Sequence, residues 1–222
     1  MTRQTESLEA ALPVGLTPRT PWNWVAIRDL GPRHAPRMLA HLLALNERDR
    51  ILRFGQLASD DQIRGYVEHV DFERDLLFGI FDRRLRLLAM AHLAFEPATD
   101  GPATVVEFGV SVLERVRGRG YGGRLFDHTV THARNRGART MMIHIVRDNS
   151  AMLAIVRRAG AELAFDGSEA VAQLQLPRNT LGSQLDELVG HRAGEVDYCL
   201  KMRALWLDRL RPGRLSRPAK RE

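Results

Sequence analysis

The segment that most constrains this chain is a short loop of arginine and glycine, with the sequence RGRGYGG over residues 117–123. A run rich in β-branched residues precedes the loop, and apolar residues at helical spacing follow it. Glycines let a backbone curl until consecutive amide N–H groups point the same way, and the start of a helix adds a partial positive charge. A strand, a glycine loop and a helix in this order predict a cradle for a pyrophosphate group.

The glycines of this loop fit more than one kind of fold. Gly118, Gly120 and Gly123 satisfy the G-x-G-x-x-G pattern of dinucleotide-binding proteins. Such a fold normally continues with a strand that ends in an acid about 20 residues later. Here the next expected strand, residues 140–146, contains no acid, and the lysine and hydroxyl residue of a P-loop are also absent. A glycine-rich turn without a ligand is a further alternative.

The elements around the loop predict the fold class. Periodicity and turn residues predict strands over residues 24–28, 76–81, 85–95, 104–113, 140–146, 163–166 and 170–176. Helices are expected over residues 32–45, from Ser59 to about 70, over 120–136 and over 150–159. The order strand, two helices, three strands, helix, strand, helix, two strands predicts an α/β fold with one central mixed sheet flanked by helices.

The ends of the chain differ from its centre. Residues 1–21 contain breakers such as Pro13 and Pro18 and are expected to be a flexible tail, and residues 22–177 are expected to be one folded domain. After Pro177 we expect a helical extension over residues 178–211. Its apolar stripe can pack on its own domain or form a homodimer. Residues 212–222 are expected to be a basic flexible tail.

Charge and composition exclude several classes of function. The net charge of +6 belongs to residues 201–222, which hold eight basic and two acidic side chains, so nucleic acid is not the expected partner. The chain has no long apolar run, which argues against a membrane span. The single cysteine, Cys199, excludes a disulfide framework and favours the cytoplasm. His128 and His132 lie four residues apart without an evident third ligand, so we expect no metal.

Three segments in sequence order resemble the GCN5-related N-acetyltransferases (GNAT). The residues Arg117-x-x-Gly120-x-Gly122 match that family's Q/R-x-x-G-x-G/A signature. The run EFGVSV over residues 107–112 resembles its fourth strand, and residues 149–161 resemble its Asn-led helix that ends in glycine. Residues 45–54, LNERDRILRF, are similar to a stretch of the branch that contains bacterial protein-lysine acetyltransferases. The resemblance covers about residues 24–176.

The resemblance implies the acyl-CoA N-acyltransferase fold and transfer of an acetyl group from acetyl-CoA to an amine. It implies that the pantetheine arm pairs with strand backbone around Val110 and Val112, where a backbone N–H faces the thioester oxygen. Amides of the loop would hold the pyrophosphate. The residues that the resemblance assigns to coenzyme A, besides those two valines, are Arg117, Gly118, Arg119, Gly120, Tyr121, Gly122, Gly123 and Asn149.

An attacking amine must first lose a proton, because a lysine-like ammonium has a pKa of about 10.4. The resemblance makes Glu107 the candidate general base and leaves His144, on the neighbouring strand, as the second candidate. Many family members carry a tyrosine that protonates the departing thiolate, but Val156 stands there, and Tyr121 is the nearest phenol in sequence. The acceptor can be a protein lysine or a small-molecule amine. A non-catalytic acyl-CoA sensor is the alternative function.

Overall fold

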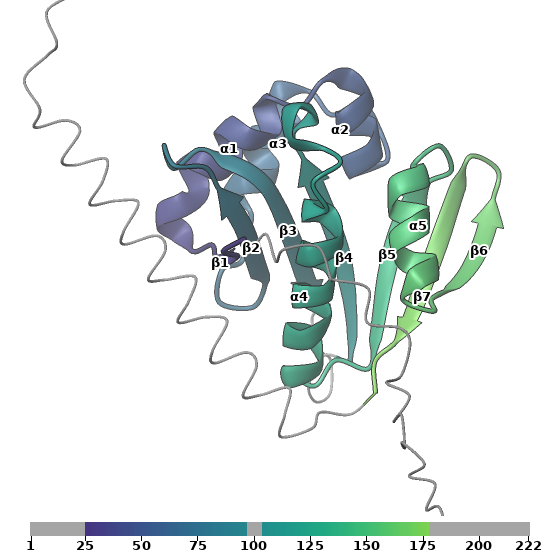
Figure 1. Cartoon of the computed structure of the whole chain (residues 1–222). Helices are drawn as coiled ribbons and strands as arrows, with labels where there is room; N and C mark the ends of the chain where they lie inside the picture. The colour runs from purple at the N-terminus through teal and green to yellow at the C-terminus, as the bar shows by residue number, and fades with distance from the viewer. Residues whose placement is uncertain (1–24, 97–103, 178–222) are drawn as a thin grey trace, which may run out of the picture.

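The computed structural model describes residues 25–96 and 104–177, which form a seven-stranded sheet covered by helices (Figure 1). The strands are β1 (Arg28–Asp29), β2 (Leu76–Phe81), β3 (Leu87–Phe95), β4 (Val105–Val112), β5 (Thr140–Val146), β6 (Glu162–Asp166) and β7 (Glu169–Gln175). The helices are η1 (Pro32–His34), α1 (Ala35–Leu43), α2 (Glu47–Phe54), α3 (Asp60–Glu68), η2 (Glu114–Val116), α4 (Tyr121–Asn135) and α5 (Ser150–Arg158). None of these helices is long and apolar enough to cross a membrane.

The sheet has the strand order β1-β2-β3-β4-β5-β7-β6, and every neighbouring pair is antiparallel except β4 and β5. This confirms the predicted α/β fold with a mixed, mostly antiparallel central sheet. The parallel pairing of β4 with β5 is short, because it runs only from Val105 opposite Thr140 to Glu107 opposite Met142. Beyond these residues the two strands separate, as Figure 1 shows between the ribbons of β4 and β5.

Each face of the sheet has its own hydrophobic core. On one face α4 and α5 bury Leu125, Phe126 and Val156 against strand residues such as Phe108. On the opposite face α1 and α3 bury Met38, Leu42 and Ile63 against β2 and β3. In Figure 1 α4 and α5 lie in front of the sheet. The upper part of β4 therefore has helices on both sides, and its alternating side chains face two different environments.

Several helix ends follow from local sequence signals. Ser59 Oγ accepts a hydrogen bond from the Gln62 N–H, and Gln62 Oε1 accepts one from the Ser59 N–H. Helix α3 is therefore capped at Ser59 as predicted, and the cap is a capping box. Helix α2 was not predicted. It begins at Asn46, whose side chain accepts from the Asp49 N–H, and it ends at Gly55 in the left-handed conformation.

Other boundaries differ from the expectation. The first strand is Arg28–Asp29, later than the expected residues 24–28, and Trp24 lies outside the described residues. The helix expected over residues 32–45 is a 3-10 turn followed by α1, which ends at Leu43. Strand β3 begins at Leu87 because Leu85, with a φ of 57°, belongs to the preceding turn. The expected N-terminal tail, C-terminal helical extension and basic tail all lie outside the described residues.

Candidate active site

The glycine loop connects the end of β4 to the start of α4. Gly118 and Gly120 have φ values of 75° and 76°, a region that side chains with a Cβ rarely adopt. Gly120 is the N-cap residue of α4, and no side chain caps this helix. The two turns in the backbone aim the loop amides and the helix N-terminus in one direction, which is the geometry of an anion cradle.

The amides of this loop have no hydrogen-bond acceptor in the part of the chain that the structure describes. Among the described residues, none of the six backbone N–H groups from Gly118 to Gly123 donates a hydrogen bond, and the first helical bond of α4 runs from the Arg124 N–H to the Gly120 carbonyl. The Arg117 N–H differs from these six, because it donates to the Glu114 carbonyl at 3.1 Å and is already paired. The Arg117 guanidinium forms an ion pair with the buried carboxylate of Asp49 on α2.

The separation of β4 from β5 leaves strand backbone open on one side. The Leu113 N–H donates to the Leu88 carbonyl of β3 at 3.0 Å. Because backbone groups of successive strand residues point to opposite edges, the N–H and C=O groups of Val110 and Val112 point toward β5. The β4–β5 ladder has already ended at Glu107 and Met142, so Val110 and Val112 have no strand partner on that edge among residues 25–96 and 104–177. The predicted pantetheine-binding positions thus offer free backbone donors and acceptors.

A cavity of about 400 Å³ lies where the two strands separate. It is lined by residues of α2, α3, β4, β5, α5 and β7. These include the predicted site residues Glu107, Val110, His144 and Asn149. Four further lining residues with polar or aromatic character are Arg53, Phe54, Tyr66 and Glu169. The site residues from the end of β4 and those from β5 are therefore brought together, although about 40 residues of sequence separate them.

Glu107 and His144 lie on the same face of the sheet. Glu107 pairs with Met142, and His144 follows Met142 by two residues, so alternation turns both side chains toward the face that α2 and α3 cover. Both side chains are exposed within the cavity. Among the described residues, neither makes a side-chain hydrogen bond or an ion pair, so the Glu107 carboxylate is open to a ligand.

The other predicted positions have clear structural roles. The Asn149 side chain accepts a hydrogen bond from the Met152 N–H at 3.0 Å and so caps α5 while it lines the cavity. Val156 is fully buried in the core between α5 and the sheet. Tyr121 packs against both hydrophobic cores and does not line the cavity. The phenol that does line it is Tyr66 of α3.

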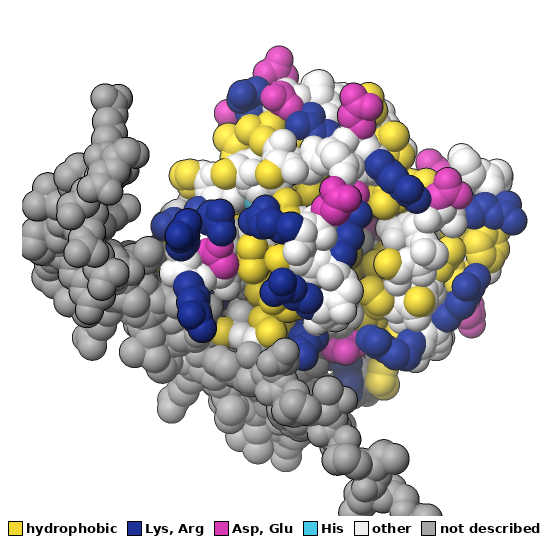
Figure 2. Space-filling view, turned by 45° about the horizontal axis from the view of Figure 1, so that its top comes forward, with side chains coloured by type: hydrophobic (Ala, Val, Ile, Leu, Met, Phe, Trp, Pro, Cys, Tyr) yellow, Lys and Arg dark blue, Asp and Glu magenta, His cyan; other side chains and the backbone are white. Residues whose placement is uncertain are grey.

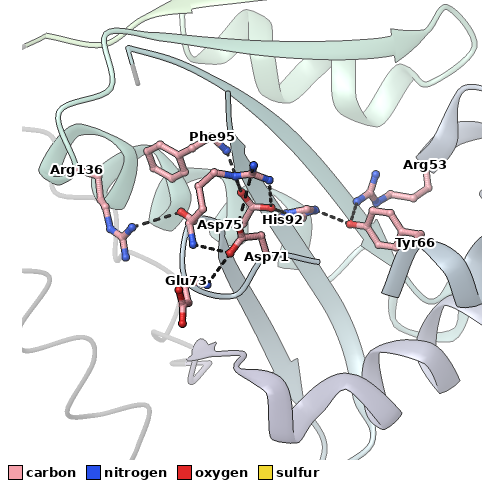
Figure 3. Close-up of polar contacts among 9 residues, drawn as sticks. Arg53, Tyr66, Asp71, Glu73, Asp75, His92, Phe95 and Arg136 are labelled. Carbon is pink, nitrogen blue, oxygen red and sulfur yellow. Dashed lines mark hydrogen bonds and ion pairs between the residues drawn. The ribbon is translucent and has the colours of Figure 1, made fainter. Parts of the chain in front are cut away.

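Tyr66 belongs to a buried polar chain that sequence reasoning missed (Figure 3). Arg53 donates from Nη2 to the Tyr66 hydroxyl at 2.8 Å, and that hydroxyl lies 2.6 Å from Nδ1 of His92. Nε2 of His92 lies 3.0 Å from Oδ2 of Asp75. Asp75 also accepts hydrogen bonds from the Arg74 side chain and from the Phe95 N–H. Arg53 occupies the cavity end of this chain, and Asp75 is its buried end.

The ionisation of these groups follows from their surroundings. Burial, aided by the charge of Arg53, holds the pKa of His92 below its usual value, so His92 is neutral near pH 7. Burial also raises the pKa of Tyr66, against the opposing effect of Arg53, so the phenol stays protonated. Burial opposes ionisation of Asp75, but hydrogen bonds from Arg74, His92 and Phe95 outweigh it and lower the pKa of Asp75. The buried polar chain that runs from Arg53 to Asp75 therefore contains a protonated phenol (Tyr66), a neutral imidazole (His92) and a carboxylate (Asp75).

His128 and His132, whose spacing could suggest a metal site, pack against each other and against an aromatic ring. The rings of His128 and His132 lie 4.3 Å apart between centroids, and each lies 4.7 Å from the ring of Phe78. No group of three or more potential metal ligands occurs in the described residues. The pair forms an aromatic cluster with Phe78 between α4 and β2.

The surface at this end of the sheet is basic. Figure 2 turns the top of the Figure 1 view forward and shows Lys and Arg side chains spread over that face, next to exposed hydrophobic side chains. Arg115 and Arg119, on either side of the turn that leads into α4, are exposed. A basic rim around open amides favours a phosphate-bearing ligand.

Comparison with known proteins gives the same fold. The GNAT domain of S. lividans PAT superposes with a TM-score of 0.58 at 19% identity, covering 68% of this chain and 89% of that one. The structure of yncA from Salmonella typhimurium with its cofactor acetyl-CoA gives 0.53 at 16%, covering 70% and 96%. An N-acetyltransferase from Staphylococcus aureus Mu50 gives 0.50 at 16%, covering 69% and 99%.

These identities are low and establish the fold alone. No curated protein sequence matches the chain. The sequence profile of the Acetyltransferase (GNAT) family, however, matches residues 21–161, which is more than half of the chain and includes the glycine loop, β4 and β5. The chain belongs to the GNAT acetyltransferase family.

Proposed function

We propose that this protein transfers an acetyl group from acetyl-CoA to an amine. The observation that carries the proposal is the run of six backbone N–H groups, from Gly118 to Gly123, that have no partner among the described residues. They lie at the N-terminus of α4, where the helix adds a partial positive charge. Two phosphates can accept several of these donors together, and exposed arginines add charge at the rim.

The open edge of β4 supports the same ligand. Val110 and Val112 present backbone N–H and C=O groups to the gap between β4 and β5, as the two amides of a pantetheine arm require. When bound, acetyl-CoA supplies the thioester whose acetyl group is transferred. The N–H of Val110 can donate to the carbonyl oxygen of that group, and a fixed donor in a site with little water is an effective electrostatic catalyst.

Glu107 is our candidate for the general base. Its carboxylate lines the cavity and has no other partner among the described residues, so it can take a proton from the acceptor's ammonium directly or through water. The amine nitrogen then bonds to the acetyl carbon, the carbon–sulfur bond breaks, and the sulfur leaves as a thiolate with the bonding electrons. The nitrogen releases its second proton to solvent water or to that thiolate, which leaves a neutral amide. His144 lines the same cavity and is the second candidate for the base.

Many family members have a tyrosine that protonates the departing thiolate. Here Val156 occupies that position, and its side chain is buried in the core. A thiol has a pKa of about 8.5, so its thiolate is a tolerable leaving group without a dedicated acid. Tyr66 is the phenol in the cavity, but its hydroxyl lies 2.6 Å from the neutral His92. We therefore assign Tyr66 no proton transfer to the thiolate.

The buried Val156 also supports a second candidate, a non-catalytic acyl-CoA sensor. Such a protein would bind acetyl-CoA with the same loop and would lack turnover. The acceptor of the enzyme can be a small-molecule amine or a protein lysine. We propose the cytoplasm as the location, since the single cysteine is the pattern of a reducing compartment. We also propose that residues 178–211 form the contact of a homodimer.

The binding part of the proposal is tested by thermal unfolding with and without acetyl-CoA. At 100 times its dissociation constant the ligand should raise the free energy of unfolding by about 2.7 kcal/mol, and coenzyme A should act in the same way. Adenosine, which lacks the pyrophosphate, is the control and should have little effect. Folded protein that shows no shift with millimolar acetyl-CoA would refute both the enzyme and the sensor.

A further inference from the structure

Arg53 is a cation in the cavity that has no acidic partner among the described residues. Its Nη2 donates to the neutral phenol of Tyr66, and its Nε is buried without a hydrogen-bond partner. The guanidinium carbon lies 5.1 Å from the ring centre of Phe54 and 5.4 Å from that of Tyr66. Arg53 is half-buried, and a guanidinium that has lost part of its water shell is stabilised by an anion, whereas the two rings supply only part of that stabilisation. The site is therefore suited to an incoming negative group.

The backbone of β4 is shaped to admit this guanidinium. A Cβ atom on Gly109 would lie 2.6 Å from Nη1 of Arg53 and 2.7 Å from its guanidinium carbon, so Arg53 lies directly on the strand where glycine leaves space. Glu107 is two residues earlier on the same face of β4 and also lines the cavity. Glu107 and Arg53 do not form an ion pair with each other. Among the described residues, the cavity thus presents the carboxylates of Glu107 and Glu169 and the guanidinium of Arg53, none of which has an ion-pair partner, and Arg53 lies against the strand that carries Glu107.

The buried polar chain fixes the orientation of Arg53. Tyr66 accepts from Arg53 and donates to Nδ1 of the neutral His92, which leaves Nε2 of His92 to donate to Asp75. The hydrogen bonds therefore run in one direction, from Arg53 through Tyr66 and His92 to the buried carboxylate of Asp75 (Figure 3). An arginine that only lined the cavity would not need three further residues to hold its orientation. The arrangement instead holds one edge of the guanidinium and leaves Nη1 for a ligand.

We propose that Arg53 binds a carboxylate on the acceptor, so that the acceptor is a small amine carrying a carboxylate, as an amino acid does. The inference rests on the proposed acetyl transfer and names its substrate class. Glu107 faces the ammonium of this acceptor and Arg53 its carboxylate, which orients the nitrogen toward the gap beside Val110. A lysine within a protein chain carries no carboxylate close to its amine, so the proposal departs here from the protein-lysine acceptor that the resemblance of residues 45–54 suggested. Tyr66, His92 and Asp75 are positioning residues for Arg53.

The test compares acceptors that differ only by the carboxylate. Suitable pairs are L-phenylalanine with 2-phenylethylamine, L-lysine with cadaverine, and β-alanine with ethylamine, with release of the coenzyme A thiol as the readout. We expect kcat/KM to favour the carboxylated member of the best pair by at least about tenfold. Arg53→Gln should raise KM for that member by roughly 10- to 100-fold and reduce the preference to about one, as loss of a charged hydrogen bond predicts.

Two further variants separate recognition from folding. Arg48→Gln changes an exposed arginine of the same helix that does not line the cavity, and it should leave the preference unchanged. Tyr66→Phe removes the hydroxyl that holds Nη2 of Arg53, so KM for the carboxylated acceptor should rise while kcat stays within about threefold. An equal loss on both members of a pair in Arg53→Gln would show a structural role and overturn the inference.

A binding measurement keeps this inference separate from the proposed catalysis. In the presence of coenzyme A, calorimetry should detect binding of N-acetyl-phenylalanine to the wild type and lose it in Arg53→Gln, whereas N-acetyl-2-phenylethylamine should bind both proteins alike. If this pattern appears without turnover of any amine, acetyl transfer is refuted and the anion site stands. If decarboxylated amines or a lysine peptide are acetylated as well as the amino acids, the anion site is refuted and acetyl transfer stands.

Discussion

At the residue scale, the chemistry of the site depends on Glu107 and on two later residues of β4 that also line the cavity, Gly109 and Val110. Gly109 leaves the space that Arg53 occupies, and Val110 turns its backbone N–H toward the gap with β5. Glu107 itself is exposed to the cavity and makes no ion pair among the described residues. Its carboxylate is therefore accessible to an acceptor amine that enters the cavity.

The first prediction concerns Glu107. Glu107→Gln keeps the shape of the side chain and removes its basicity, so turnover should fall by roughly 10²- to 10⁴-fold. Acetyl-CoA affinity should stay nearly unchanged, because Glu107 lies before the open edge of β4 and away from the loop amides. Raising the pH should restore part of the rate, since more of the amine is then neutral without help. The measurement is a pH–rate profile of both proteins with one acceptor.

His144→Asn is the companion variant in the same assay. It should lower turnover less than Glu107→Gln does, because His144 is the second candidate for the base. A larger loss from His144→Asn would move the base to β5. Wild-type rates from Glu107→Gln would show that solvent or another group removes the proton.

At the scale of elements, α2 connects the two halves of the site. Its first turn holds Asp49, which pairs with Arg117 of the glycine loop, and its last turn holds Arg53, which reaches the cavity. Asn46, at its N-cap, also donates to Glu114 of η2 at 3.4 Å. Asp49 and Arg53 lie about one turn apart, so the helix connects the expected phosphate cradle to the expected acceptor pocket.

The second prediction tests the loop as a phosphate cradle. Gly120→Val should abolish detectable acetyl-CoA binding, because a branched side chain is strained at a φ of 76° and the loop amides would turn away. Gly137→Val is the matched control at the other end of α4. It has a φ of 85°, and a Cβ there also meets no atom within 4 Å, so the strain is similar while the loop is untouched. Calorimetry should show lost affinity in the first variant and retained affinity in the second.

How much the sequence could predict differs among the elements. The strands over residues 76–81 and 140–146 are found at the predicted positions, and α3 begins at the predicted cap, because apolar runs and capping residues are local signals. Helix α2 was missed because it has no apolar stripe. Its buried residue is Asp49, and charged residues occupy most of its length. Its cap residues, Asn46 and Gly55, were the signal that could have revealed it.

The candidate site was likewise predicted only in part. The resemblance gave the glycine loop and the residues of β4, β5 and α5 that the structure places around the gap and the cavity. It included Arg53 in the stretch over residues 45–54 but gave that residue no role, and it could not connect Arg53 to Tyr66, Asp75 and His92, which come from α3, the loop before β2, and β3. In sequence Tyr66 fits the apolar face of its helix. Only the packing of that helix on the sheet brings its hydroxyl to His92.

At the scale of the whole molecule, buried neutral histidines make the fold sensitive to acid. Burial, aided by the charges of neighbouring arginines, lowers the pKa of His34 to about 4. Burial also lowers the pKa of His41 to about 4, although its contact with the Leu87 carbonyl opposes this. The pKa of an unfolded histidine is about 6.5, so between pH 4 and 6.5 the unfolded chain binds more protons. Stability must therefore fall as the pH falls through this range.

The third prediction uses His41, whose ring contacts the Ser111 hydroxyl at 2.8 Å and the Leu87 carbonyl at 3.1 Å. Between pH 7 and pH 5 the wild type should lose up to about 2 kcal/mol of unfolding free energy through this one group. His41→Gln should be less stable at pH 7 but should lose correspondingly less on going to pH 5. Urea unfolding at both pH values measures the difference, and parallel losses in the two proteins would show that His41 is already charged in the native state.

The central claim is acetyl transfer, and a product balance tests it most directly. The full-length protein is incubated with acetyl-CoA and a panel of amines that includes amino acids, polyamines and a lysine peptide. Free thiol and acetylated amine are quantified in the same samples by absorbance and mass spectrometry. The account predicts equal amounts of both products with at least one amine, well above the rate without protein, and a loss of roughly 10²-fold or more in Glu107→Gln. Binding of acetyl-CoA without any acetylated amine across the panel would contradict it and identify the protein as a sensor.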